Sequence, residues 1–271
     1  MLYATVDTFN IERGATALAL RLCEATGAAL TGFLLNLDAN APPSPDSRSF
    51  DQLRAASELR EVRNGANVQV LLNQAAQGGV VAQAVTKLDH SRGVISCVAD
   101  YARLHDLVVI GADSTGLLSD RMIAENLLFE IGRPLMVVPP DYSSEFDCHR
   151  IAVAWDNSRV AARALGDALA LFPGVEEVIL LMIGDEKAIL SSIDHDTMVR
   201  MLERRGVAAR VERRGLNGRS IGDAIQEGTH ETGANLLVMG GYGHSRLRDF
   251  ILGGATLSVF AHPQLPVLLS H

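Results

Sequence analysis

The sequence predicts an α/β protein with two tandem open parallel sheets of five strands, each sheet with helices on both faces. Short apolar runs alternate with longer segments whose apolar residues recur at helical spacing, which is the pattern of strand–helix–strand units. This pattern occurs twice along the 271 residues. Hydrophobic residues make up 48% of the chain, which is enough to form a substantial core.

The duplication is visible in the strands themselves. Four apolar segments of the first copy recur in the same order in the second copy, at offsets that drift from about 150 to about 130 residues. The matched segments are 2–7 with 151–156, 29–35 with 177–183, 105–111 with 234–240, and 133–138 with 265–270. Each copy therefore has the order β-α-β-α-β-α-β-α-β, and right-handed crossovers make its sheet parallel.

The helices and the remaining strands follow from spacing and capping signals. Alanine- and leucine-rich segments with helical spacing predict helices at 13–25 and 159–171. Ser220 and Asp223 stand three residues apart as in a capping box, so we expect a helix from there to Glu231. The corresponding helix of the first copy, and the strands that precede the two helices, are expected at 93–104, 80–87 and 207–213.

Residues 50–78 are the extra length of the first copy. Their apolar residues keep an i, i+3, i+4, i+7 spacing, which predicts a mostly helical segment broken at Asn64-Gly65. These residues are Val68, Leu71, Leu72 and Ala75. A strand at 68–72 is the alternative for this part of the segment.

Two segments rich in proline and serine mark connections between elements. Residues 41–45 predict a loop, and residues 139–144 predict a linker, which gives domains at 1–142 and 150–271. Charge divides unevenly between the two parts. Residues 1–149 carry 11 basic and 18 acidic side chains, a net charge of −7, whereas residues 150–271 carry 13 and 14, a net charge of −1.

Composition excludes several classes of protein. The net charge of −8 disfavours nucleic acids and anionic membranes as partners, since both attract clustered positive charge. The three cysteines have no CxxC spacing, which argues against structural disulfides and a cysteine-built zinc site. No secretion signal and no membrane-spanning apolar run is recognisable, so we expect a soluble cytoplasmic protein.

The segment after the fourth strand of the second copy is rich in glycine. Residues 240–256 are GGYGHSRLRDFILGGAT. Glycines allow several backbone N–H groups to point into one concavity. Gly253 and Gly254 also open a helix expected at 255–261, whose N-terminal N–H groups favour an anion. The segment is either a cradle for a polyphosphate or a pair of ordinary turns.

Two other strand ends offer candidate ligand contacts, because ligands of open parallel sheets bind beyond the carboxyl ends of the strands. Asp156 could accept a hydrogen bond from a ribose hydroxyl or help to hold a metal. It could also be the N-cap of the helix that follows, and the two roles are compatible. Ile183 could present its backbone to an adenine edge or could be an ordinary core residue.

Other chemistry-bearing motifs are excluded. A P-loop requires a lysine, which this region lacks, and a GxGxxG fingerprint requires a glycine where Arg246 or Arg248 stands. Residues 194–196 (Asp-His-Asp) have the chemistry of metal ligands, but neighbouring helical residues point in different directions, which favours a solvated turn. His244 and Ser245 belong to no acid–base–nucleophile set, so no catalytic residue is assigned.

These residues resemble the adenine-nucleotide motif of the universal stress protein family. The spacing G-x2-G-x9-G follows a strand, and the first strand of the same copy ends in aspartate. The resemblance covers essentially the whole chain and implies a tandem form with two Rossmann-like, adenine nucleotide alpha hydrolase-like domains. It implies ribose contact by Asp156, adenine contact by Ala154 and Ile183, and a phosphate loop of Gly240, Gly243, Gly253, Gly254, Ala255 and Thr256 above Met239.

Both copies depart from the family pattern. Gly254 stands where the family usually has serine or threonine, which removes a hydroxyl donor but keeps the amide. In the first copy, residues 111–114 lack the second glycine, and the position thirteen after Gly111 is Ala124, followed by Glu125. A carboxylate at a phosphate site repels the phosphate. We therefore expect the first copy to bind no nucleotide and to pair structurally with the second.

The leading hypothesis is a stress-response protein that binds ATP, ADP or AMP in its C-terminal domain, with Mg²⁺ or Mn²⁺. The resemblance implies binding rather than turnover, with at most slow ATP hydrolysis, and it leaves homodimerisation open. A nucleotide-free scaffold built from two such domains is the first alternative. An adenylate-forming or ATP-pyrophosphatase enzyme is the second, although its S-G-G-x-D-S loop would fall where residues 156–159 read DNSR.

Overall fold

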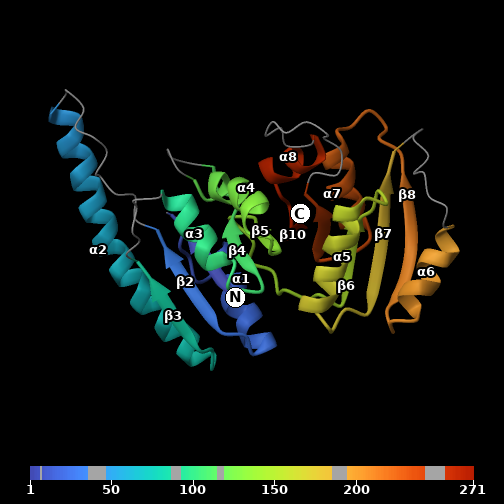
Figure 1. Cartoon of the computed structure of the whole chain (residues 1–271), viewed down its shortest axis with the longest axis horizontal. Coiled ribbons are helices and arrows are strands. Elements are labelled where there is room, and N and C mark those ends of the chain that lie inside the picture. The colour runs from blue at the N-terminus through green and yellow to red at the C-terminus, as the bar shows by residue number, and fades with distance from the viewer. Residues whose placement is uncertain (7, 36–46, 87–92, 115–118, 185–193, 242–253) are drawn as a thin grey trace.

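The computed structural model describes residues 1–6, 8–35, 47–86, 93–114, 119–184, 194–241 and 254–271, with the backbone alone at 47–57 and 261 (Figure 1). Several residues that the sequence singles out lie outside these ranges: Asp7, the loop at 41–45, Gly243, His244, Ser245, Arg246, Arg248 and Gly253. Within the described part of the chain, every helix is too short or too polar to cross a membrane.

The N-terminal half alternates strands and helices as predicted. Its elements are β1 (Leu2–Thr5), α1 (Gly14–Thr26), β2 (Leu30–Leu34), α2 (Ser47–Gln77), β3 (Ala82–Val85), α3 (Val94–Ala102), β4 (Val108–Gly111), α4 (Asp120–Glu130) and β5 (Leu135–Val138). Local chemistry sets the helix ends. Helix α1 ends at Gly27, whose φ of 68° favours glycine, and α4 begins after Ser119, whose hydroxyl accepts a hydrogen bond from the Met122 N–H.

The C-terminal half repeats this order. Its elements are β6 (Arg150–Ala154), α5 (Arg159–Leu171), β7 (Glu177–Ile183), α6 (His195–Glu203), β8 (Ala208–Arg214), α7 (Ile221–Glu231), β9 (Leu236–Gly240), α8 (Gly254–Ala261) and β10 (Val267–Ser270). The capping signal before α7 is confirmed. The Ser220 hydroxyl accepts from the Asp223 N–H at 3.2 Å and donates to the Asp223 carboxylate at 2.7 Å.

The α/β class with a mostly parallel sheet is confirmed, and the two halves share one sheet of ten strands in the order β3-β2-β1-β4-β5-β10-β9-β6-β7-β8. Within each half the five strands are parallel. Strands β5 and β10 pair antiparallel, with Val137 opposite Val267. This pairing removes two exposed sheet edges, which is why the two sheets expected from the sequence are joined.

The antiparallel seam fixes where the two halves present their functional edges. Because β5 and β10 run in opposite directions, the carboxyl ends of the N-terminal strands and of the C-terminal strands lie at opposite edges of the common sheet. In each half the second and third strands are added on one side of the first strand, and the chain then crosses to its other side. This change in strand order falls between β1 and β4 in one half and between β6 and β9 in the other. These are the switch points at which such sheets bind ligands.

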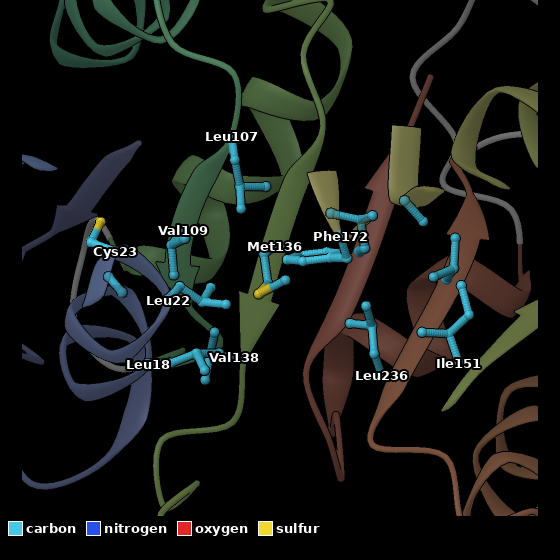
Figure 2. Close-up of a cluster of buried hydrophobic side chains, with 14 of the residues drawn as sticks. Leu18, Leu22, Cys23, Leu107, Val109, Met136, Val138, Ile151, Phe172 and Leu236 are labelled. Atoms are coloured by element: carbon cyan, nitrogen blue, oxygen red, sulfur yellow. The ribbon is translucent and has the colours of Figure 1, made fainter. Parts of the chain in front are cut away.

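Each face of the sheet carries an apolar cluster that spans both halves. One cluster lies under α1, α2, α5 and α6 and includes Leu18, Met136, Phe172 and Leu236, several of which meet across the seam (Figure 2). The other lies under α3, α4, α7 and α8. Alternate strand residues enter alternate clusters, as the two-residue period of a strand requires.

Helix α2 is continuous over Ser47–Gln77, so the break expected at Asn64-Gly65 is absent, and the alternative strand at 68–72 is wrong. The predicted apolar face is present: Leu71 and Ala75 are buried. Asn64 extends the buried face because its side-chain amide donates hydrogen bonds to the carbonyls of Leu34 and Leu35, at 3.3 and 3.2 Å. A polar residue whose sequence context predicts a helix break thus provides the hydrogen-bond donor for two carbonyls at the end of β2.

Candidate functional site

The residues singled out by the sequence converge on the carboxyl ends of β6, β7 and β9. Ala154, the last residue of β6, pairs with Leu181 of β7 on one side and with Met239 of β9 on the other. Asp156 follows two residues later, and Gly240 follows Met239. The register therefore brings the expected ribose contact and the first glycine of the expected phosphate loop to the same switch point.

Asp156 shapes the turn between β6 and α5. Its carboxylate accepts a hydrogen bond from the Ser158 N–H at 3.0 Å, and Asn157 between them has a φ of 61°. The helix is capped by Ser158, whose hydroxyl accepts from the Ala161 N–H at 3.2 Å. The alternative role of Asp156 as N-cap is therefore wrong, because the N-cap is Ser158, two residues later, and the Asp156 carboxylate accepts from the Ser158 N–H instead.

Gly240 has a packing reason to be glycine. A Cβ atom at this position would lie 2.6 Å from the backbone carbon of Val160 and 2.7 Å from the backbone nitrogen of Ala161. The end of β9 thus touches the first turn of α5, and any side chain there would push the strand and the helix apart. This contact places the start of the glycine-rich segment directly beside the turn that contains Asp156.

Helix α8 supplies the second wall of the site. It connects β9 to β10, so its N-terminal N–H groups lie at the edge where β9 ends. Gly254 is exposed, with no atom of the described residues within 4 Å of a Cβ built on it, and Thr256 is buried. Gly222 of α7 contacts Ser258 so closely that a side chain at position 222 would displace α8. Helix α8 is thus exposed at its first residue, Gly254, and packed closely against α7 at Ser258.

The apolar candidates share one face of the sheet. Met239 is buried in the cluster under α7 and α8, and Ala154, Ile183 and Ala255 pack partly exposed against that same cluster. Partly exposed small and branched apolar residues at strand ends can support a flat aromatic ring. The structure thus brings together the residues expected at the adenine and those expected beneath the phosphate loop.

Trp155 lies between Ala154 and Asp156 and is the single tryptophan of the sequence. Its side chain packs against the cluster on the opposite face of the sheet from Ala154. Its indole N–H is buried without a hydrogen-bond partner in the described part of the chain. Sequence reasoning gave this residue no role, and its ring lies across the sheet from the side chain of Ala154.

The Asp-His-Asp segment is a helix start, as its contacts show. Asp194 is the N-cap of α6 and accepts a hydrogen bond from the Thr197 N–H at 2.7 Å. The His195 imidazole instead contacts the Arg213 guanidinium at 2.8 Å. Over the ranges that the structure describes, no three histidine, cysteine, aspartate or glutamate side chains are grouped as metal ligands.

The corresponding strand ends of the N-terminal half hold a buried carboxylate. Asp120, the first residue of α4, accepts hydrogen bonds from the Val6 N–H at 2.7 Å, from the Thr5 hydroxyl at 3.0 Å and from the Thr8 hydroxyl. One of its oxygens lies 3.1 Å from a Cβ built on Gly111. Asp120 is 1% exposed, and this burial raises the pKa of its carboxyl to about 6.

The carboxylate at these strand ends is that of Asp120 and not, as expected from the sequence, that of Glu125. Glu125 is one turn further along α4 and pairs with Arg121 at 2.9 Å, while Ala124 is buried in the core. The connection from Gly111 to α4 is shorter than that from Gly240 to α8, so counting thirteen residues from Gly111 overshoots the helix start. The available signal was the Ser119-Asp120 pair, a typical start of a helix.

A separate cavity of about 390 Å³ lies at the seam between the halves. It is lined by Met1, by the end of α1 and Ala28 after it, by the residues just before β4 and β5, and by one side of α5 from Arg163 to Leu171 with Phe172 beyond it. Arg163 and Asp167 at its wall pair with each other at 2.8 Å. The cavity shares no lining residue with the predicted site.

Comparison with known proteins places the C-terminal half in a family. Residues 148–271 match the model of the Universal stress protein family, a range that contains every candidate site residue named above. Universal stress protein Slr1230 of Synechocystis sp. is 23% identical over 206 residues, covering 72% of this chain and 68% of that protein. The C-terminal half is thus a universal stress protein family domain.

Solved structures extend the likeness of fold to the whole chain. The crystal structure of a universal stress protein from Archaeoglobus fulgidus superposes with a TM-score of 0.66, covering 99% of this chain and 95% of that one, at 15% identity. A Pseudomonas aeruginosa protein superposes with a TM-score of 0.53 over 99% of this chain and 92% of its own, at 12% identity. The N-terminal half therefore shares in the same α/β fold.

Proposed function

We propose that this chain is a tandem universal stress protein of the cytoplasm that binds ATP or another adenine nucleotide in its C-terminal half. The ligand contacts would be those of the sequence analysis, with the ribose at Asp156, the adenine at Ala154 and Ile183, and the phosphates at residues 240–256. The N-terminal half binds no nucleotide in this proposal and has a structural role. Binding, rather than rapid turnover, is the activity.

The observation that carries the proposal is the meeting of three different features at one switch point. Asp156 lies in the turn after β6, Gly240 lies against the start of α5, and the N-terminus of α8 lies at the same edge. A carboxylate suits the ribose hydroxyls, and helix N–H groups suit phosphate. The partly exposed apolar side chains of Ala154 and Ile183 suit an aromatic base.

A divalent metal fits this site as a companion of the nucleotide. Asp156 supplies a carboxylate, and the described residues hold no cluster of three side-chain ligands that would bind an ion by themselves. Mg²⁺ is commonly bound by one or two carboxylates together with substrate phosphates. Asp156 would thus help to hold Mg²⁺ or Mn²⁺, which would neutralise phosphate charge.

Nucleotide binding by the N-terminal half is opposed by its own side chain. Asp120 occupies the space beside Gly111, where the strand ends would have to admit a ligand. A buried carboxylate both fills that space and repels phosphate. The proposal therefore predicts one nucleotide per chain rather than two.

The test combines calorimetry with the fluorescence of Trp155. The full chain is titrated with ATP–Mg²⁺, ADP and AMP, and isothermal titration calorimetry gives the stoichiometry. A ligand at 100 times its Kd should stabilise the folded protein by about 2.7 kcal/mol, which scanning calorimetry resolves easily. Trp155 lies in the chain between Ala154 and Asp156, so a shift of this strand end on binding should change its emission along the same binding curve.

Gly254→Val and Gly166→Val form a matched pair of variants. Both glycines are exposed residues of helices, and among the described residues neither has an atom within 4 Å of a built Cβ, so the unliganded fold should tolerate either change. Gly254→Val should abolish the ATP-dependent stabilisation, because the side chain occupies the phosphate position, whereas Gly166→Val should retain it. Nucleotide-free wild-type protein that responds to no nucleotide would contradict the proposal and favour the scaffold.

A further inference from the structure

Helix α4 belongs to the N-terminal half, but its last turn reaches the candidate site of the C-terminal half. It starts at the carboxyl edge of the N-terminal strands and runs to their amino edge before β5. Because β5 and β10 are antiparallel, this amino edge adjoins the carboxyl edge of the C-terminal strands. The topology thus carries a helix of one half to the strand ends of the other (Figure 1).

Two contacts of α4 with the C-terminal half lie at this meeting point. The Leu128 side chain is 2% exposed, and its Cδ2 lies 2.8 Å from a Cβ built on Gly241. The Phe129 ring packs edge-on against the His271 imidazole, with centroids 5.2 Å apart. Gly241 itself donates its N–H to the Ser270 carbonyl at 2.8 Å. The last turn of α4 is therefore packed against the ends of both β9 and β10.

Gly241 is constrained by this neighbour rather than by its own backbone. It is absent from the residues with positive φ among those described, so its conformation would admit alanine. The three atoms nearest to a Cβ built on Gly241 all belong to the Leu128 side chain. Gly240 is held on the other side by Val160 and Ala161. The end of β9 is thus clamped between α5 of its own half and α4 of the other.

The clamp is rigid because α4 is anchored at both ends. At its start, Asp120 accepts three hydrogen bonds from the N-terminal half. Along its length, Ile123 and Leu127 are completely buried, and Ile131 is nearly so. Closely packed interiors transmit displacement rather than absorb it. A change in the size of the side chain at position 128 should therefore displace Gly241 more than the other residues of the site.

We infer that Leu128 is a positioning residue for the nucleotide site, through which the N-terminal half fixes the end of β9 in the orientation that binding requires. The inference rests on the proposed function. It assigns the first copy, which lacks the glycine motif, a direct part in the site of the second. Nucleotide affinity then depends on a residue that lies outside the family domain at 148–271 and touches no nucleotide.

A size-swap cycle with a matched control tests this inference. Leu127→Ala and Leu128→Ala each remove a buried leucine from α4, so both variants should melt at lower temperature by comparable amounts. Measured by titration at a temperature where all variants are folded, Leu128→Ala should weaken ATP binding by about five-fold or more, and Leu127→Ala by less than about two-fold. Gly241→Ala should also weaken binding, and the double variant Gly241→Ala with Leu128→Ala should recover most of that loss.

Each outcome of the cycle decides between the two proposals. Equal ATP affinities in Leu127→Ala and Leu128→Ala, or additive losses in the double variant, would overturn the role of Leu128 and leave the nucleotide site intact. Failure of the wild-type protein to bind any adenine nucleotide would overturn both proposals. Selective loss in Leu128→Ala with recovery in the double variant would support both.

Discussion

Replacement of Asp120 by asparagine should change how the stability of the protein depends on pH. Asp120 is buried at the strand ends of the N-terminal half, where the Val6 N–H and the Thr5 and Thr8 hydroxyls donate to it. Burial, and to a smaller degree the nearby Asp113 carboxylate, raises its pKa from 3.8 to about 6, against the opposing effect of these hydrogen bonds. The asparagine amide retains an acceptor for the Val6 N–H and offers donors to the hydroxyls, which can rotate to accept.

The size and sign of the effect follow from proton linkage. The folded protein binds the Asp120 proton more tightly than the unfolded chain does, so protonation favours folding. Each ten-fold difference in proton affinity corresponds to about 1.4 kcal/mol, and the change from 3.8 to about 6 therefore amounts to about 3 kcal/mol. This contribution is complete below pH 3.8 and is lost as the pH rises through 6.

The measurement is urea unfolding of wild type and Asp120→Asn from pH 4 to pH 7.5. The free energy of unfolding of wild type should fall relative to the variant by about 2–3 kcal/mol across this range, and the difference should be constant above pH 7. Asp141→Asn is the control, since Asp141 is exposed and pairs with Arg13 at the surface, a pair that contributes about 0–1 kcal/mol. A wild-type-minus-Asp120→Asn difference that is flat, or that rises with pH, would refute the argument from burial.

Two further predictions concern packing. Gly240→Ala should destabilise the protein by about 1–3 kcal/mol because its Cβ meets the backbone of α5 at Val160, whereas Gly166→Ala within α5 should stabilise by about 0.5–1 kcal/mol; denaturant midpoints of both variants check the opposite signs. Asn64→Ala should cost about 1–3 kcal/mol because two buried carbonyls at the end of β2 lose their donor, and the exposed Asn73→Ala should be nearly neutral in the same unfolding assay.

The candidate site shows how far local patterns reach. Asp156 and Gly240 were found because a short polar residue or a glycine directly after an apolar strand marks a strand end. The packing reason for a glycine at position 240 could not be seen in the sequence, because the contact of Gly240 with Val160 joins segments that are 80 residues apart. Asp120 was missed for the same reason: an aspartate at a helix start is ordinarily exposed, and only the approach of β1 and β4 buries it.

The sequence by itself determined the duplication, the order of strands and helices, the cap at Ser220 and the edge at which the candidate site residues lie, because periodicity and capping act over a few residues. The tertiary structure decided three further points: the joining of β5 to β10, the burial of Asp120 and the contact of Leu128 with Gly241. Each depends on packing between segments distant in the chain. Such contacts leave no periodic trace in a single sequence, and here they link the site of one half to a helix of the other.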